Sequence, residues 1–419
     1  MKLFKEIRKH PSYKWVVVGA CFAMIMVCLG FCSSSKSLYL KAITEALSLE
    51  RSLFSVNDSI RYVATALVNL FFGSLVLRVG PRKMIAGGFV CLMASMMIDA
   101  VAESLPMFYL GGTLLGIGQS WTSTTIVGYV VGLWCRENKG TIMGAVLAAN
   151  GIGTAITTQI IRPIINASTF GYRTAYHITT VILLVVGLLV VLLFKDRPEE
   201  PSAAPSGNKK TRGGGWQGLT LGACLKKPYF YMILLCVFFT GVVIQSTAGI
   251  YVAHMEDVGI DGNFITTVAT VYALCITATK FLTGVLYDRL GLRVTLLICN
   301  IASAVAMVLL AALTPELSWL AMVFGIAFAI GVPLETIMLP LITADMFGDR
   351  DSARILGILV SAGTAGYAVG TPVVNLFYDQ QGTYQTVLLL MGGVMAAVTV
   401  LSILALNASQ KLKNQLSQV

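Results

Sequence analysis

Two similar ten-residue stretches, half a chain apart, decide the fold. Gly284-Val-Leu-Tyr-Asp288-Arg289-Leu-Gly291-Leu-Arg293 has a counterpart in Gly73-Ser-Leu-Val-Leu-Arg78-Val-Gly80-Pro-Arg82, which lies 211 residues earlier (284 − 73). A second pairing sets Gly118 to Trp134 against Gly331 to Phe347. The chain therefore consists of two related halves. Parallel repeats of this kind are typical of secondary transporters, in which two six-helix halves enclose a site at the middle of the membrane.

Composition places the chain in a membrane. Apolar residues make up 56% of the sequence and charged residues 12%, and the mean hydropathy is +0.79. A soluble domain carries about 25% charged residues. Apolar stretches long enough to cross a hydrocarbon core of roughly 30 Å as helix recur along the whole chain. We expect twelve of them, in two sets of six, near residues 15–39, 54–77, 84–102, 107–134, 141–166, 175–194, 229–253, 264–287, 294–313, 318–344, 355–377 and 384–407.

The two sets of spans predict two bundles, residues 1–194 and 229–419. The connecting residues 195–228 contain Pro198-Glu-Glu-Pro-Ser-Ala-Ala-Pro-Ser-Gly-Asn-Lys-Lys-Thr-Arg-Gly-Gly-Gly215. A segment so rich in Pro, Gly, Ser and charge predicts a flexible linker and not a packed element. The expected fold is thus an all-α membrane protein with two pseudo-symmetric six-helix bundles.

Positive charge is distributed unevenly among the loops between the expected spans. The loops that share a side with both termini hold most of the Lys and Arg, whereas the opposite loops hold only Lys41, Arg51 and Arg173. Because Lys and Arg near span ends resist translocation, both termini are expected in the cytoplasm, with the chain in the plasma membrane. The net charge of +10 is then an orientation signal. Nucleic-acid binding is not expected, because the cations are spread over many short loops.

The nine cysteines give no sign of a disulfide framework or a metal site. Their number is odd, and most lie within the apolar stretches. No Cys/His pair has the spacing of metal ligands, so no metal or other cofactor is expected. The sequence also lacks a Walker-type phosphate loop, which disfavours pumping driven by ATP. The first apolar segment is too long for the core of a signal peptide and is expected to stay as a helix.

Two lysines lie within apolar stretches. Lys36 is near the outer end of the first, and Lys280 is inside another, in Cys275-Ile-Thr-Ala-Thr-Lys280-Phe-Leu-Thr-Gly284. A cation at bilayer depth costs roughly 2.5–3.5 kcal/mol on insertion scales, so it tends to face a watery cavity. With few acidic neighbours, the two lysines indicate a cavity for an anion. In the alternative, Lys36 extends to the outer interface and Lys280 forms a structural ion pair.

The repeated stretch, Gly-x-x-x-Asp-Arg-x-Gly-x-Arg, resembles the loop signature of the major facilitator superfamily. The second copy is complete, with Asp288 and Arg289 at its centre. A carboxylate beside an arginine at a helix end can fasten neighbouring helix termini together, so both residues are expected to act in gating. In the first copy, Leu77 occupies the acidic position, and the usual charge contact lacks its acid there.

Within that superfamily, the chain resembles monocarboxylate transporters and oxalate:formate exchangers over most of its length. Ser34-Ser35-Lys36-Ser37-Leu38 is similar to their lysine-serine step, and Tyr251-Val-Ala-His254-Met-Glu-Asp-Val-Gly259 to their entry into the eighth helix. Lys280 falls where they carry arginine, four residues before a glycine. The resemblance implies that Lys280 binds the substrate carboxylate.

Three positions depart from those families. Lysine at position 280 is a point charge, whereas arginine offers a planar fork, so its hold on a carboxylate is expected to be less directional. Ile276 stands where proton-coupled members carry aspartate, so proton symport lacks its best-attested residue. Gly363 stands where exchangers for the smallest dicarboxylate carry a second lysine, so specificity for oxalate is not expected.

Three further polar residues are candidates for coupling or gating. Glu335, in the tenth span, is the most deeply placed acid. It either pairs with Lys280 in an empty cavity and exchanges protons, or forms a static salt bridge. His254 either takes a proton near neutral pH or makes a helix-end hydrogen bond. Arg61, toward the outer end of the second span, is expected to form an outer ion pair in preference to a ligand contact.

Four residues are candidates to line the substrate path. Gln119, Trp121 and Asn150 lie near the middle of spans four and five, although Trp121 is open to a plain packing role. Tyr39 follows Lys36 by three residues on the same helical face, where its hydroxyl could donate to a carboxylate. Runs of small residues, such as Gly111-Gly112, indicate close helix packing and not phosphate binding.

The sequence as a whole predicts a carrier, not an enzyme, that moves small organic anions, monocarboxylates above all, by alternating access. Anion exchange and proton symport both stay open. The expected partners are a small carboxylate, protons in the case of symport, and the lipid bilayer, and we expect a monomer. Two other classes compete. An exporter of drugs or other amphiphiles should have an acidic cavity, which the lysines oppose, and a non-transporting sensor would need an output domain, which the short termini do not supply.

Overall fold

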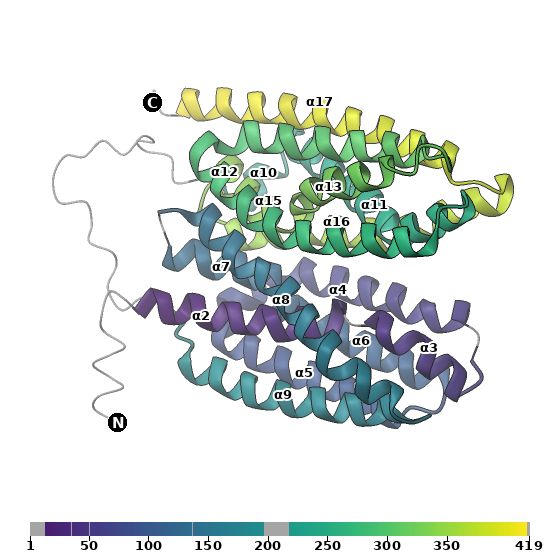
Figure 1. The fold of residues 1–419 in the computed structure, drawn as a ribbon. Helices are drawn as coiled ribbons and strands as arrows, with labels where there is room; N and C mark the ends of the chain where they lie inside the picture. The colour runs from purple at the N-terminus through teal and green to yellow at the C-terminus, as the bar shows by residue number, and fades with distance from the viewer. Residues whose placement is uncertain (1–12, 35, 50, 136, 197–217, 417–419) are drawn as a thin grey trace.

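The computed structural model describes residues 13–34, 36–49, 51–135, 137–196 and 218–416. All regular structure in these ranges is helical. The central linker predicted at residues 195–228 lies largely outside the described residues. The helices form two bundles that lie side by side, one of blue and purple elements and one of green and yellow elements (Figure 1).

The first bundle holds the helices of the N-terminal half. They are α2 (Tyr13–Ile25), the π-helix η1 (Met26–Ser34), α3 (Lys36–Ala46), α4 (Arg51–Val79), α5 (Pro81–Val101), α6 (Leu105–Thr122), α7 (Thr124–Trp134), α8 (Lys139–Asn166) and α9 (Gly171–Leu193). α2 and η1 together form one apolar stretch of 22 residues. The wide turns of η1 directly precede the helix that carries Lys36, and such turns are frequent at functional sites.

The second bundle holds the helices of the C-terminal half. They are α10 (Leu221–Cys224), α11 (Pro228–Asp257), α12 (Gly262–Ala311), α13 (Leu320–Gly331), α14 (Pro333–Thr336), α15 (Met338–Phe347), α16 (Ser352–Gln381) and α17 (Gln385–Leu416). α13 and α14 are bent by 50° relative to α15. The predicted tenth span is therefore a broken helix, with Glu335 next to the break.

The glycines of the repeated stretch explain why it recurs. Gly80 and Gly291 both have a positive φ, of 86° and 81°, which side chains other than hydrogen rarely tolerate. Gly80 separates α4 from α5, and Gly291 breaks the 50-residue α12 into two helices. Each half thus makes the same turn with the same residue type. We call the end of the molecule that holds both turns the motif end.

The number of membrane crossings agrees with the prediction as far as the described residues allow. Nine helices there have the length and apolar composition to cross a membrane, and the bent α13–α15 makes a tenth. α12 contains two predicted spans on either side of Gly291, and the predicted span 107–134 is divided between α6 and α7 at Ser123. A total of twelve crossings stays a prediction.

The two bundles meet along two pairs of helices, α8 with α12 and α4 with α16. At the first crossing, a Cβ atom added to Gly284 would overlap the carbonyl oxygen of Gly140, and one added to Gly140 would overlap that of Gly284. At the second, a Cβ on Gly73 would overlap the backbone of Arg354. Small residues allow this backbone-to-backbone approach, as in other membrane helices.

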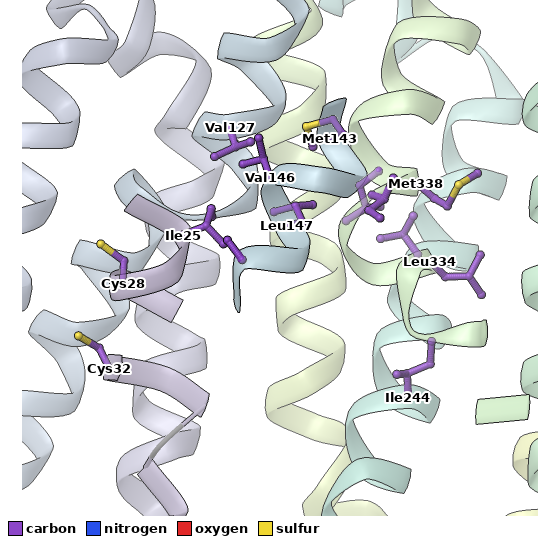
Figure 2. Packing of buried hydrophobic residues seen from close by; sticks show 14 of the residues in the cluster. Ile25, Cys28, Cys32, Val127, Met143, Val146, Leu147, Ile244, Leu334 and Met338 are labelled. Carbon is purple, nitrogen blue, oxygen red and sulfur yellow. The ribbon is translucent and has the colours of Figure 1, made fainter. Parts of the chain in front are cut away.

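Apolar side chains fill the contact between the bundles away from those crossings. Met143 and Leu147 of α8 lie opposite Leu334 and Met338 of the second half (Figure 2). All four are buried members of one continuous apolar core. Apolar packing therefore joins the halves next to the motif end.

Candidate functional site

A cluster of opposite charges lies where η1, α3 and α4 meet. The Lys36 ammonium donates to Asp58 Oδ1 at 3.1 Å, and Arg61 Nη2 lies 3.4 Å from the same oxygen. Arg61 Nη1 also donates to Ser33 Oγ at 2.7 Å. The cation side chains are largely buried, whereas 49% of the Asp58 side chain is exposed. Two buried cations thus share one carboxylate, which leaves one positive charge uncompensated within this group.

A second pair of charges lies in the other half. Lys280 is 6% exposed on α12, and its backbone carbonyl packs against Gly144 of α8. Among the described residues, no hydrogen bond or ion pair within 4 Å holds its ammonium, and Glu335 is the charged group that acts on it. Oε1 of Glu335 also has no hydrogen-bond partner there. Lys280 is thus not held in a direct salt bridge in this structure.

Aromatic and amide groups connect the two charge clusters across the halves. The Arg61 guanidinium lies 4.4 Å from the centre of the Tyr62 ring. Tyr62 accepts a hydrogen bond from Gln245 Nε2 of α11 at 3.0 Å, and its ring meets that of Tyr367 edge to face at 5.5 Å. Tyr367 in turn interacts with the Glu335 carboxyl. A polar path therefore runs from the first cluster to the second through Tyr62.

A small cavity lies behind Glu335, inside the second bundle. It has a volume of about 30 Å³, and helices α11, α12, α16 and α17 contribute to its wall. Polar atoms come from Thr240, Asn300 and Ser402, and the last two are within hydrogen-bond distance of each other at 3.4 Å. Gly363 also lines it. This space holds about one or two water molecules and no organic ligand.

The motif end is fastened by Asp288. Its carboxylate accepts hydrogen bonds from the backbone N–H groups of Gly140 and Thr141, at 3.1 and 2.7 Å, and from Thr141 Oγ1 at 2.6 Å. These donors form the first turn of α8, in the opposite half, where the helix dipole also favours a negative charge. The expectation of a carboxylate contact at helix ends thus corresponds to a contact between the halves, which we call the Asp288 latch.

The corresponding place in the first half has no such latch. Leu77 is 46% exposed. Asp351, which precedes α16, lies 3.9 Å from Arg354 and accepts from the backbone N–H of Leu221 at 2.8 Å, both in its own half, and its side chain makes no capping hydrogen bond to α16. The crossing of α4 and α16 is instead joined by packing and by a hydrogen bond from Ser361 Oγ to the carbonyl oxygen of Ala66.

Replacing Asp288 by asparagine is expected to loosen the motif end. Asparagine still accepts hydrogen bonds but lacks the charge, and loss of a negative charge at a helix N-terminus costs about 0.3–1 kcal/mol, so we expect the open population at this end to rise about two- to fivefold. The readout is the alkylation rate of a cysteine placed at Met143, which is buried between the halves. Asp349→Asn, an exposed carboxylate at the same end, is the control. Equal alkylation rates in the two variants would show that the latch has no such effect.

The structure separates several of the other predicted residues from the charge clusters. Trp121 packs over Gly87 and Gly88 of α5, which is the plain packing role. His254 is buried with Nε2 2.9 Å from the Leu310 carbonyl oxygen, so the helix-end hydrogen bond is the role observed. Tyr39 stacks on Tyr176 of α9 at 4.3 Å, inside its own bundle.

The remaining predicted residues have less definite surroundings. Asn150 accepts from Ser34 Oγ at 3.0 Å, close to the η1–α3 junction. Gln119 is buried, and its Nε2 has no hydrogen-bond partner among the described residues. Arg289 is exposed beside the latch and makes no ion pair within the described ranges.

Four residues that the sequence reasoning missed complete the site. Asp58 pairs with Lys36, so the expectation that this lysine has few acidic neighbours is wrong. Tyr62, Gln245 and Tyr367 form the connection between the halves. Asp58 lies three residues before Arg61 on one helical face, a spacing that signals an ion pair. Nothing in the sequence alone marks the other three.

Known proteins similar to this chain are transporters of one superfamily, and the matches cover most of its length. The family model described as Major Facilitator Superfamily matches residues 20–254 and 233–418. The uncharacterized MFS-type transporter YcxA of Bacillus subtilis is 25% identical over 296 residues, which cover 70% of this chain and 69% of that protein. Monocarboxylate transporter 12 of Homo sapiens is 20% identical over 419 residues, covering 93% and 80%.

A solved structure extends the likeness to three dimensions. The crystal structure of the MFS transporter FucP in the outward conformation superposes with a TM-score of 0.68, and the match covers 94% of this chain and 99% of that one. The sequence identity is 16%, so this likeness concerns the fold alone.

Proposed function

The chain belongs to the major facilitator superfamily, and from this premise we propose that it is a secondary carrier of small organic anions, with monocarboxylates as its substrates. The observation that carries the proposal is the set of buried cations in the two charge clusters. Lys36 and Arg61 share one carboxylate, that of Asp58, as their ion-pair partner, and the ammonium of Lys280 has no salt bridge within 4 Å among the described residues. An anionic substrate offsets their charge. A relative named as a monocarboxylate transporter supports the same substrate class.

The proposed binding group is Lys280. Its ammonium is buried and forms no salt bridge within 4 Å among the described residues, so its N–H groups can donate hydrogen bonds to a substrate carboxylate. A buried cation of this kind is costly alone, and a bound anion with hydrogen bonds offsets that cost. In this proposal, Lys36, on the side of the exposed Asp58, moves toward the bound carboxylate and closes the site over it.

The proposed mechanism is alternating access of two bundles, residues 1–194 and 229–419, about this site. The close helix crossings and the Asp288 latch lie at the motif end. The surplus of Lys and Arg in the loops supports a cytoplasmic position for that end, and the plasma membrane is the proposed location. In the described state this end is then closed by the latch.

Binding of short carboxylates to the purified protein tests the substrate class. Lactate, pyruvate and acetate are expected to raise its melting temperature, because a ligand that binds only the folded state stabilises it. Amphiphilic cations of equal concentration serve as the comparison. Stabilisation by these cations alone would instead indicate an exporter of amphiphiles.

Uptake into proteoliposomes, with and without an imposed pH gradient, separates the two coupling modes. Proton symport through Glu335 makes net uptake follow the gradient. Counterflow of labelled carboxylate that is independent of the gradient, without net uptake, would identify an anion exchanger.

A further inference from the structure

Asp99 is a buried acid for which the site described above has no use. It lies near the end of α5 that is far from the motif end, and 1% of its surface is exposed. Both carboxylate oxygens lack a hydrogen-bond partner among the described residues. The carboxyl is pressed against the backbone of Gly111 on α6, since a Cβ added there would overlap Asp99 Oδ1.

The groups around Asp99 come from every side of the first bundle. Tyr39 on α3 and Tyr176 on α9 are the titratable hydroxyls that face it, and Lys36 is the cation that acts on it. Toward α6, the backbone of Gly111 lies against it. Asp58 and Arg61 on α4 act on the same Lys36. Asp99 and the first charge cluster also lie against adjacent residues of α6: Gly111 lies against Asp99, and Gly112 lies against Asn57, whose side-chain amide is 3.2 Å from Lys36 Nζ.

An ionised carboxyl in such a place is unfavourable. A buried charge needs a partner and hydrogen bonds, and neither oxygen of Asp99 has a donor among the described groups. The neutral acid avoids most of this cost, and a cation close to the carboxyl offsets the rest. The protonation state of Asp99 therefore changes the net charge of the groups around Lys36.

We propose that Asp99 is a proton-binding site whose occupancy controls anion binding through Lys36; this rests on the proposed function. With Asp99 neutral, Lys36 and Arg61 face Asp58 alone, and the first cluster keeps one positive charge for the anion. With Asp99 ionised, that charge is cancelled. The proton and the anion therefore bind together. The proton comes from water at the exposed Asp58 face and is carried as the carboxylic acid.

This site lies in the opposite half from Glu335, the acid considered for coupling on sequence grounds. Position 276, where the resemblance would place an acid, holds isoleucine. In this proposal, the proton-binding acid is instead on another helix, in the other bundle. The two acids can be separated by mutation, because Asp99 acts on Lys36 and Glu335 acts on Lys280.

Infrared difference spectra of the purified protein test whether Asp99 holds a proton. At neutral pH, the stretching band of protonated carboxyl groups is expected to lose one component in Asp99→Asn, which has the shape of the neutral acid. Glu335→Gln is the matched control and is expected to leave that component in place. Identical spectra for the wild type and Asp99→Asn would overturn the assignment, and this readout needs no ligand.

The pH dependence of lactate binding tests the linkage. In the wild type, affinity is expected to fall by up to about tenfold per pH unit once Asp99 ionises, because each anion then takes up about one proton. Asp99→Asn is expected to lose that proton uptake and to keep the affinity that the wild type has at low pH. An unchanged pH slope would overturn the linkage. Absence of lactate binding at every pH would instead refute the proposed function, while the infrared result on Asp99 would stand.

Discussion

Replacing Lys280 by alanine is expected to weaken lactate binding about 100-fold, because a charge-assisted hydrogen bond in a buried site contributes up to about 3 kcal/mol. The ammonium is buried and is the cation of its cluster. Its removal takes away the group that attracts the carboxylate, and no other cation within the described residues of this cluster takes its place. The dissociation constant, obtained from thermal shifts over a range of lactate concentrations, is the measurement.

Two further variants sharpen this prediction. Lys280→Arg keeps the charge and is expected to bind within about tenfold of the wild type, although the planar fork changes the geometry of the contact. Lys226→Ala removes an exposed lysine before α11 and is expected to bind normally. Wild-type affinity in Lys280→Ala would remove this residue from the site and with it the main support for an anionic substrate.

Replacing Gly284 by valine is expected to lower the transport rate about tenfold or more while leaving lactate binding within about threefold, because overpacking a tight contact costs 1–3 kcal/mol. A Cβ at this position would overlap the Gly140 carbonyl oxygen, and the neighbour is backbone that cannot rotate away. The closed arrangement of the motif end is thereby disfavoured, whereas the binding residues are not changed. Initial uptake rates and thermal shifts on the same preparation measure the two effects.

Gly393→Val is the matched control. Gly393 lies in a long helix of the same half, and an added Cβ there meets nothing within 4 Å. Transport at the wild-type rate is expected for it. Equal rates in the two valine variants would show that the Gly140–Gly284 crossing does not have to close during the cycle.

The overall architecture could be predicted from sequence because it depends on local signals that repeat. The two copies of the motif predicted two matching turns, and Gly80 and Gly291 have the positive φ that such turns need. Apolar length predicted the helices, and the breaks within them were missed. Ser123 lies within Gln119-Ser-Trp-Thr-Ser-Thr-Thr125, and Pro333 and Glu335 stand before the bend after Thr336, so the local signals of both breaks are polar residues and a proline and not a change in span length.

The candidate site could be predicted only in part. Lys36 and Lys280 stand out because a charge in an apolar span is unusual, and both lie in the charge clusters of the structure. Their partners depend on how neighbouring helices are rotated about their axes, which a uniformly apolar sequence does not fix. Tyr62 and Gln245 are 183 residues apart and meet only because the halves pack together. Trp121 and His254 were chosen for their chemistry, and packing turned both toward structural contacts.

The crossing of α8 and α12 has a thermodynamic consequence. Two glycines face each other there, so the central contact is main chain against main chain, with the side chains of Tyr287 and Asp288 beside it. Ordering a long side chain costs up to about 2 kcal/mol, and glycine has none to order. Docking and undocking of the two glycines themselves therefore freeze and release no rotamers. The two glycines can therefore come into contact and separate in every transport cycle with little loss of conformational entropy. The lifetime of the contact then depends on the hydrogen bonds of the Asp288 latch beside it.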